Sequence, residues 1–514
     1  MEKKKKDGKI FTTPNTVTHM LRDVLDYYNC VDLGDGTHVW PNIKKHIIDN
    51  SCGDGAFLSE IVELFCSRNG YFYKDTEKNC TIHKEVSKKE IKRCLETYIH
   101  GIELDPAEYE KCIKNLDAKA AWYGITGVKW DIQNRDALSC HDYDGKMDYV
   151  VANPPYIRVH DLECDLSDYS FADEGMTDIY LAFYELGFRM LNDTGRMCYI
   201  APSSWFVSGA GQKMRDYVLE NQCLAKVEDY GHLQLFENAT TYVAIELFTK
   251  DKNDTVEYWK MGVTPDDGRW YYADAVKTVV KYDDMVIDGK FYFGTKEQLD
   301  WMREIIEYGK SLKKEDKAFE VKNGFATLAD DIFIGTDFTW LSEDYVISVI
   351  KASNKKWTTC IYPYDKEGKL VCEEEFKKKA GLQYIQLTKN RDKLEARSTE
   401  EPWYAFGRTQ AINDVQKTKW AIKSIVKSEK DLEPELVKPG SGVYGGLYIL
   451  PCVKECNNNF IEYYLATTLG STYFMDYVKM LRKYKSGGYY TFSSKELENY
   501  LNWIWKEGKK LYEQ

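Results

Sequence analysis

The tetrapeptide Asn153-Pro154-Pro155-Tyr156 most constrains the fold of this chain, because it directly follows the apolar run 149–152. A short apolar run that ends in prolines predicts a buried strand, since prolines fix the backbone and remove its donors. The asparagine oxygen can accept hydrogen bonds from an NH2 group, and the tyrosine ring can stack on a base. These four residues suit the binding of a planar amine, although two prolines after a strand are also typical of an ordinary turn.

A second strand end lies upstream, where residues 47–57 predict an apolar strand, a glycine-containing turn and the start of a helix. Gly53 and Gly55 would let a ligand approach the backbone closely. Asp49 and Asp54 place negative charge where a phosphate would otherwise bind. The turn therefore favours a cationic sulfonium or amino group over an anion.

Two further segments, residues 102–106 and 130–138, predict strands that end in acidic residues. In such folds an acid after the second strand binds ribose hydroxyls, although each acid alone is also compatible with a solvated loop or a helix cap. Four strand ends, each followed by a helix-like segment, predict a doubly wound, Rossmann-like α/β sheet with its ligands at the carboxyl ends of the strands.

With these motifs the chain resembles the S-adenosylmethionine-dependent adenine-N6 DNA methyltransferases of the Eco57I/TaqI-like family. In that family the cofactor motifs precede the Asn-Pro-Pro-Tyr motif (the gamma order) and a target-recognition domain follows. The resemblance continues through residues 177–183, 195–202 and 230–242. Asp49 and Glu103 are 54 positions apart, against about 20 expected for this fingerprint, which implies an insertion near residues 67–96.

The resemblance also implies roles for single residues. The glycine turn and residues 11–17 would hold the methionine end of the cofactor, Glu103 the ribose, and Asp136 the adenine amine. The cofactor-binding residues implied are Thr12, Thr13, Pro14, Asp49, Cys52, Gly53, Gly55, Phe57, Glu103, Asp136, Ala137 and Asn153.

The chemistry expected of the motif follows from the weak nucleophilicity of an aromatic amine, whose lone pair is spread into the ring. Asn153 and the Pro154 carbonyl can accept hydrogen bonds from both amino protons, so Asn153, Pro154 and Tyr156 are the predicted catalytic residues. The target base must leave the duplex to reach them. The family implies that Tyr156 and Phe236 stack on the two faces of that base, with Tyr242 as a substitute for Phe236, although both could be ordinary core aromatics.

Charge is distributed unevenly along this chain of net charge −12. Residues 1–320 carry 41 Lys+Arg and 56 Asp+Glu, whereas residues 321–514 carry 29 and 26. Because DNA binding favours basic surfaces, we expect the duplex to contact the C-terminal part. The candidate contacts are Arg408, Arg482, Lys483, Lys485 and Tyr489, although lysine clusters of this kind are equally typical of a solvated surface.

The domains expected from these signals are a methyltransferase domain at 1–250, a connector or arm of either half at 251–318, and a mixed α/β target-recognition domain at 319–514. The 14 cysteines form no paired C-x-x-C motifs and accompany no histidine cluster, so we expect reduced thiols and no metal site. No apolar run approaches the about 20 residues of a membrane span, and no apolar region follows the basic N-terminal run. A cytoplasmic, bacterial-type, nucleoid-associated protein is expected.

The predicted function is sequence-specific methylation of adenine N6 in double-stranded DNA, within a restriction-modification system or as an orphan epigenetic enzyme. Only about ten residues precede the cofactor region, so a nuclease fused in front is not expected, and a cognate endonuclease would act separately. Two alternatives stay open: a methyltransferase for RNA or protein glutamine, and a catalytically inactive DNA-binding or specificity subunit.

Overall fold

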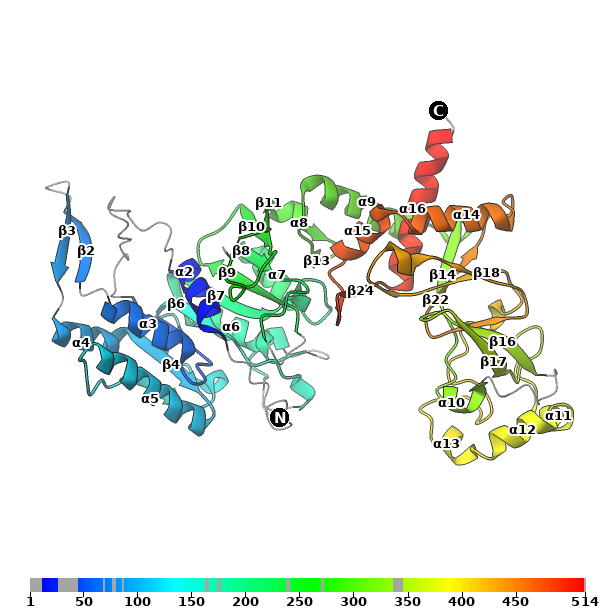
Figure 1. Cartoon of the computed structure of the whole chain (residues 1–514), viewed down its shortest axis with the longest axis horizontal. Helices are drawn as coiled ribbons and strands as arrows, with labels where there is room; N and C mark the ends of the chain where they lie inside the picture. The colour runs from blue at the N-terminus through cyan, green and yellow to red at the C-terminus, as the bar shows by residue number, and fades with distance from the viewer. Residues whose placement is uncertain are drawn as a thin grey trace. The chain divides into compact units, whose positions relative to one another are not determined.

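The computed structural model describes residues 12–25, 45–67, 70–75, 80–85, 87–161, 166–172, 177–236, 241–269, 272–335 and 345–512. The chain divides into two compact units, residues 1–299 and residues 300–514 (Figure 1). Each unit has its own sheets and helices. No helix in the described part of the chain is long and apolar enough to cross a membrane.

The first unit is built on a nine-stranded sheet with the order β11-β10-β8-β9-β7-β6-β1-β4-β5. The five strands from β5 to β7 are parallel to one another, and β9 runs antiparallel to both of its neighbours. This is the doubly wound α/β sheet predicted from the four strand ends. Its strands are β1 (Ile47–Asp49), β4 (Ile99–Glu103), β5 (Asp131–Asn134), β6 (Met147–Ala152), β7 (Leu191–Pro202), β8 (Leu224–Asp229), β9 (Val243–Thr249), β10 (Thr255–Lys260) and β11 (Val276–Lys281).

Helices cover both faces of this sheet. Successive side chains of a strand point to opposite faces, and in β7 they pack against different helices. Cys198 and Ile200 of β7 belong to the apolar cluster that also contains residues of α2 to α5. Between them, Tyr199 lies against Gly187 of α6, on the other face. The helices are α2 (Pro14–Val24), α3 (Ala56–Ser67), α4 (Lys88–Tyr98), α5 (Pro106–Trp122), α6 (Tyr180–Met190) and α7 (Gln212–Asn221).

Most of the stretch 67–96, predicted as an insertion, forms a hairpin and helix α4 (Lys88–Tyr98) between α3 and β4. Strands β2 (Gly70–Asp75) and β3 (Cys80–Glu85) pair with each other as an antiparallel hairpin outside the main sheet. The following helix α4 is instead part of the core, since its Ile91, Cys94 and Leu95 are buried. The polar and basic residues of its exposed face account for its loop-like appearance in the sequence.

The segment expected as a connector or an arm of either half at 251–318 extends the sheet of the first unit in its first part. Strands β10 and β11 extend the main sheet beyond β8, so residues 255–281 belong to the first unit. The amphipathic stretch near residue 300 forms helix α9 (Lys296–Ser311), which spans the boundary between the two units.

The second unit is a mixed α/β structure, as predicted. Its sheets have the orders β14-β22-β18-β20, β15-β17-β16-β21 and β19-β24-β23. The strands are β14 (Phe319–Asn323), β15 (Ile334–Gly335), β16 (Val346–Lys351), β17 (Lys356–Ile361), β18 (Lys419–Ile422), β19 (Ile425–Val426), β20 (Glu435–Val437), β21 (Gly442–Tyr444), β22 (Leu447–Pro451), β23 (Tyr484–Lys485) and β24 (Tyr489–Thr491). The helices are α10 (Asp330–Phe333), α11 (Glu373–Lys379), α12 (Gly381–Thr388), α13 (Arg391–Glu395), α14 (Asn458–Leu469), α15 (Thr472–Met480) and α16 (Ser494–Tyr512).

Candidate active site

The predicted site residues gather at one edge of the main sheet, because β1, β4, β5 and β6 are parallel and end at the same edge. Asp49 is the last residue of β1 and Glu103 the last residue of β4. Asn153 directly follows β6, and Asp136 lies just beyond β5. Asp49 and Asn153 are about 100 residues apart in the sequence, and the parallel pairing of the strands brings their ends together.

The glycine turn after β1 is fixed by hydrogen bonds to the neighbouring strand end. The Gly53 amide donates to Glu103 Oε2 (2.9 Å), and the amide of Asp105 donates to Glu103 Oε1 (2.7 Å). Gly53 and Gly55 have φ of 53° and 86°, a left-handed backbone that side chains rarely adopt. At Gly55 a Cβ atom would lie 2.7 Å from Cys112 Sγ, so glycine also allows α5 to pack closely here.

The residues of this turn fit a cationic cofactor. A Cβ atom on Gly53 would meet no atom within 4 Å, so there is room in front of this backbone. The Asp49 carboxyl is 1% exposed, and burial, together with the nearby charges of Glu103 and Asp54, raises its pKa to about 8. A bound cation would relieve this repulsion, whereas a phosphate would increase it.

Asn153 is held from two sides. Its Nδ2 donates to Thr12 Oγ1 (3.1 Å), and its Oδ1 accepts a hydrogen bond from the Tyr156 hydroxyl (2.6 Å). The Ser51 hydroxyl of the glycine turn donates to the Asn153 backbone oxygen (3.4 Å). The glycine turn thus contacts the backbone of the predicted catalytic residue. The Ile200 carbonyl lies 2.9 Å from the Tyr156 hydroxyl and is a second possible acceptor for it.

Two further aromatic rings pack against Tyr156. The Tyr156 ring centroid lies 6.4 Å from that of Phe236, with the planes 60° apart, and 6.3 Å from that of Tyr180. The predicted pair of stacking residues therefore lies together, but the two rings are not parallel. Tyr242, the substitute, packs edge-on against His232 instead.

The remaining predicted cofactor residues occupy varied positions. Thr13 caps α2 by accepting from the Thr16 amide, and Pro14 is the first residue of that helix, as the sequence indicated. Asp136 is exposed and caps the short helix that begins at the buried Ala137. The residues that lie in the core are Cys52, whose Sγ is 4.0 Å from that of Cys112, and Phe57 of α3. Phe11, the first residue of the predicted cofactor segment 11–17, lies outside the described residues.

Two residues that sequence reasoning did not single out also belong to this edge. Leu104 follows Glu103 and is 68% exposed, which is unusual for a large apolar residue at a strand end. Tyr180 packs against Tyr156 and shares a hydrogen bond with Ser204 (3.4 Å). The apolar Leu104 directly after the acidic end of β4 could have been singled out from the sequence, whereas no local pattern distinguishes Tyr180.

The predicted DNA contacts lie in the second unit. Arg408 and Lys485 are exposed, and Tyr489 is 38% exposed with Lys427 Nζ 5.7 Å from its ring centroid. Lys483 forms an ion pair with Glu496 (2.6 Å). Arg482 is only 7% exposed, and this burial does not support a direct contact to DNA.

Known proteins are similar to this chain in sequence and in fold. Residues 57–236 match the family model described as the Eco57I restriction-modification methylase. Residues 57–236 are therefore similar to an Eco57I-like DNA methylase domain. S-adenosylmethionine is the cofactor that this similarity implies.

Similar proteins include restriction-modification enzymes. The Type II restriction enzyme and methyltransferase RM.Eco57I of Escherichia coli is 21% identical, over 91% of this chain and 54% of that protein. The Type II methyltransferase M.BanIII of Aneurinibacillus aneurinilyticus is 23% identical, over 88% of this chain and 84% of that protein. The chain thus spans about half the length of the first relative and most of the second. The Type IIL restriction-modification enzyme MmeI, solved in complex with DNA, has the same fold, with a TM-score of 0.57 and 12% identity over 94% of this chain and 63% of that one.

Proposed function

We propose that the chain transfers a methyl group from S-adenosylmethionine to N6 of an adenine flipped out of double-stranded DNA. The hydrogen bond from Ser51 to the Asn153 backbone oxygen carries this proposal, because it places the glycine turn beside the residue whose side chain would hold the amine. A methyl donor at the end of β1 and an acceptor at the end of β6 would then be neighbours.

Asn153 and Pro154 act on the amine in this proposal. The Asn153 amide oxygen and the Pro154 carbonyl accept hydrogen bonds from the two N6 protons and draw the nitrogen toward tetrahedral geometry. Bound S-adenosylmethionine supplies the electrophilic methyl group. No covalent intermediate with the protein is needed, since positioning alone can contribute about 7–11 kcal/mol in favourable cases.

The cofactor itself would contact the residues at the strand ends. Asp49 and the glycine turn face its cationic methionine end, Glu103 its ribose, and Asp136 its adenine amine. We add Leu104, whose exposed side chain beside Glu103 can pack on the purine ring. Thr12, which precedes α2, contributes through its contact with Asn153.

The target base would enter between Tyr156 and Phe236. A base between two rings needs their planes about 7 Å apart and parallel, since each stack is about 3.5 Å thick. The observed rings are 6.4 Å apart and tilted by 60°, so one of them must rotate as the base enters. Phe236 is the ring we expect to move, because Tyr156 is hydrogen-bonded to Asn153 and to Ile200.

The second unit would bind the duplex through Arg408, Lys485 and Tyr489, with Lys483 and Arg482 behind the β23–β24 hairpin. We place the protein in a bacterial-type cytoplasm, acting on nucleoid DNA. Its biological role would be restriction-modification, with a cognate endonuclease as a separate partner, because its relatives RM.Eco57I and M.BanIII are Type II enzymes of that kind.

Methyl transfer from labelled cofactor tests this function. The purified chain is incubated with duplex DNA, with structured RNA and with a protein extract, and incorporated label is measured for each. We expect label in duplex DNA alone. Label in RNA or protein instead would contradict the proposal, and cofactor binding without any transfer would support an inactive DNA-binding subunit.

A further inference from the structure

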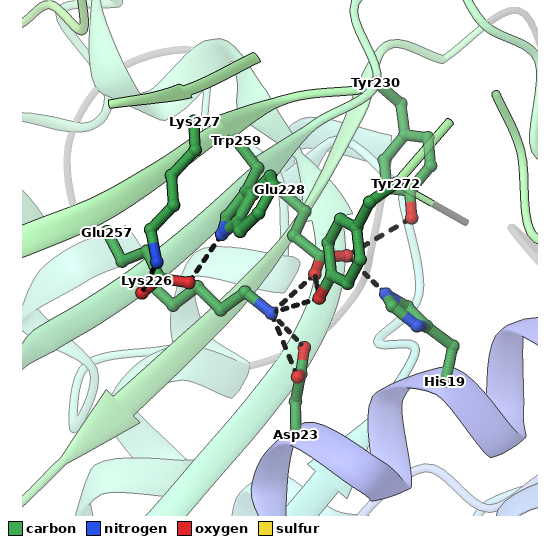
Figure 2. Close-up of polar contacts among 9 residues, drawn as sticks. All are labelled: His19, Asp23, Lys226, Glu228, Tyr230, Glu257, Trp259, Tyr272 and Lys277. Carbon is green, nitrogen blue, oxygen red and sulfur yellow. Dashed lines mark hydrogen bonds and ion pairs between the residues drawn. The ribbon is translucent and has the colours of Figure 1, made fainter. Parts of the chain in front are cut away.

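A buried cluster of charged side chains joins helix α2 to the main sheet (Figure 2). His19 and Asp23 lie one turn apart on one face of α2, and Lys226 and Glu228 lie on one face of β8. Tyr272, from the segment between β10 and β11, completes the group. We call these five residues the α2 latch.

Direct polar contacts connect the whole latch. Lys226 Nζ lies 3.0 Å from both carboxylate oxygens of Asp23 and 2.7 Å from Glu228 Oε1. Glu228 Oε2 lies 2.5 Å from His19 Nε2. The Tyr272 hydroxyl lies 2.8 Å from Lys226 Nζ and 3.0 Å from Glu228 Oε1. Apart from the Lys226–Glu228 pair, which lies within β8, each of these contacts joins β8 either to α2 or to the β10–β11 segment.

Its charged groups are buried. The side chains of His19 and Glu228 are 2% and 0% exposed, and those of Lys226 and Asp23 are 10% and 6% exposed. Burial opposes the charged form of His19, but Glu228 outweighs it and raises the histidine pKa. Burial likewise opposes the charged form of Glu228, but His19 and Lys226 lower its pKa. Asp23 and Glu228 thus face the Lys226 ammonium and a histidine whose pKa Glu228 raises, while burial and Glu228 raise the pKa of Asp23 to about 6. Removal of Lys226 would leave the two buried carboxyl groups without the ammonium that bridges them.

The latch is not suited to a metal ion, although His19, Asp23 and Glu228 bring ligand atoms within 4.8 Å of one another. The Lys226 ammonium already bridges the two carboxylates, so a cation would first have to displace it.

Helix α2 carries the latch at one end and a contact to the catalytic amide at the other. Thr12, directly before the helix, accepts the hydrogen bond from Asn153 Nδ2. Asp266, also between β10 and β11, accepts hydrogen bonds from Thr13 Oγ1 (2.6 Å) and Asn15 Nδ2 (3.0 Å). The β10–β11 segment therefore fixes both ends of α2, through Tyr272 and through Asp266.

We propose that the α2 latch positions the active site: it holds α2 on the sheet and thereby holds Thr12 against Asn153. His19, Asp23, Lys226, Glu228 and Tyr272 are then positioning residues, and they act on methyl transfer through Thr12. The inference assigns a role to the β10–β11 segment that no motif indicated. The predicted effect of the α2 latch on turnover rests on the proposed function, but its predicted effect on the stability of α2 does not.

Lys226→Met tests the latch, because it removes the ammonium that bridges Asp23 and Glu228. The double variant Asp23→Asn/Lys226→Met also removes the Asp23 carboxylate that the single variant leaves without this cation. Lys277→Met is the matched control: Lys277 forms an ion pair with Glu257 (2.6 Å) nearby on the same sheet, and both side chains are solvent-exposed. Tyr272→Phe is a milder variant that keeps the ring and removes the hydroxyl.

Hydrogen exchange of α2 amides and steady-state kinetics are measured for each folded variant. We expect Lys226→Met to speed exchange in α2 by about tenfold or more relative to β6 and β7, and to lower kcat by about tenfold. The double variant should recover part of both losses, Tyr272→Phe should show about two- to fivefold effects, and Lys277→Met none.

Several outcomes would overturn the latch. One is a rate of hydrogen exchange in the α2 amides of Lys226→Met that is unchanged, or that rises equally throughout the first unit. Another is a double variant no better than Lys226→Met. If Lys226→Met does not fold, the comparison of Tyr272→Phe with Lys277→Met decides by the same criteria. Wild-type protein that transfers no methyl group to DNA would contradict the proposed function, and the exchange data would still decide the latch.

Discussion

The Tyr156 hydroxyl donates a hydrogen bond to Asn153 Oδ1 at 2.6 Å, and thus occupies the atom that the proposed chemistry needs for the amine. A hydroxyl has one proton, so it can serve only one acceptor at a time. The Ile200 carbonyl, 2.9 Å away, offers the second acceptor. Arrival of the target base would transfer this hydrogen bond from Asn153 to Ile200 and free the amide oxygen without leaving the hydroxyl unpaired.

Tyr156→Phe tests this exchange of partners. The variant keeps the stacking ring and removes the competing donor, so we expect kcat within about threefold of wild type. Tyr156→Ala removes the ring as well and should lose about 1–3 kcal/mol of base stacking, which is about 5- to 150-fold in kcat/KM. Equal losses in the two variants would show that the hydroxyl, and not the ring, matters.

Gly53→Ala, compared with a control glycine, separates the effect of backbone strain on stability from the effect of the added methyl group on cofactor binding. Alanine at φ 53° should lower the free energy of unfolding by about 1–2 kcal/mol, and its methyl group would enter the space where we place the cofactor. Gly145→Ala is the control, because Gly145 has φ 68° and equal space but lies before β6, at the opposite edge of the sheet. We expect similar thermal destabilisation of both variants and weakened S-adenosylmethionine binding only for Gly53→Ala. Equal cofactor affinity of the two variants would contradict this placement.

The pKa of Asp49, raised to about 8 mainly by burial, predicts a pH dependence of cofactor binding. Deprotonation creates the negative charge that attracts a cationic cofactor, so affinity should rise between pH 6 and 9. The cofactor's own amino group loses its proton near pH 8 and opposes this trend. The difference between wild type and Asp49→Asn, measured by calorimetry, isolates the contribution of the carboxyl, and identical pH profiles would contradict it.

The same pKa predicts the pH dependence of stability without cofactor. Because folded Asp49 keeps its proton up to about pH 8 while the unfolded chain loses it near pH 4, folding becomes less favourable as pH rises through that window. The free energy of unfolding should therefore fall more steeply with pH for wild type than for Asp49→Asn in denaturant titrations.

The exposed basic residues of the second unit predict a salt-dependent interaction with DNA. Lys485→Ala and Arg408→Ala should each weaken duplex binding and reduce the slope of log affinity against log salt by about 0.9 for each phosphate that is no longer neutralised. Lys479→Ala is the control, because Lys479 forms an ion pair with Asp476 (3.4 Å) within α15. Three equal slopes, measured by fluorescence anisotropy, would move the DNA-binding surface elsewhere.

Local signals predicted the parts of the fold that depend on neighbouring residues. Thr13 caps α2 and Pro14 is its first residue, a local pattern typical of a helix start. At the start of α16 the Ser493 amide donates to Glu496 Oε2 and the Glu496 amide donates to Ser493 Oγ, so a serine followed three residues later by a glutamate is a second local signal. The strand ends at Asp49 and Asn153 were also recognisable, since a buried parallel strand is a short apolar run followed by a turn.

Contacts between distant segments were not predictable in this way. Thr12 and Asn153 are 141 positions apart, and Lys226 meets an aspartate 203 positions away, so no local pattern records either pair. Strand β11 was missed because it is an edge strand with mostly exposed residues, which reads as a polar loop. Arg482 looked like a surface residue among basic neighbours, yet the turn after α15 places it inside.

Identification of the methylated nucleoside tests the central claim most directly. Duplex DNA treated with the wild-type chain and labelled S-adenosylmethionine is digested to nucleosides, and the same is done with Asn153→Ala. We predict label in N6-methyladenine only, and a loss of at least about 100-fold in turnover for Asn153→Ala with cofactor and DNA binding retained, because the amide oxygen acts mainly in the transition state. Label in another nucleoside, or near-normal turnover of Asn153→Ala, would contradict the account.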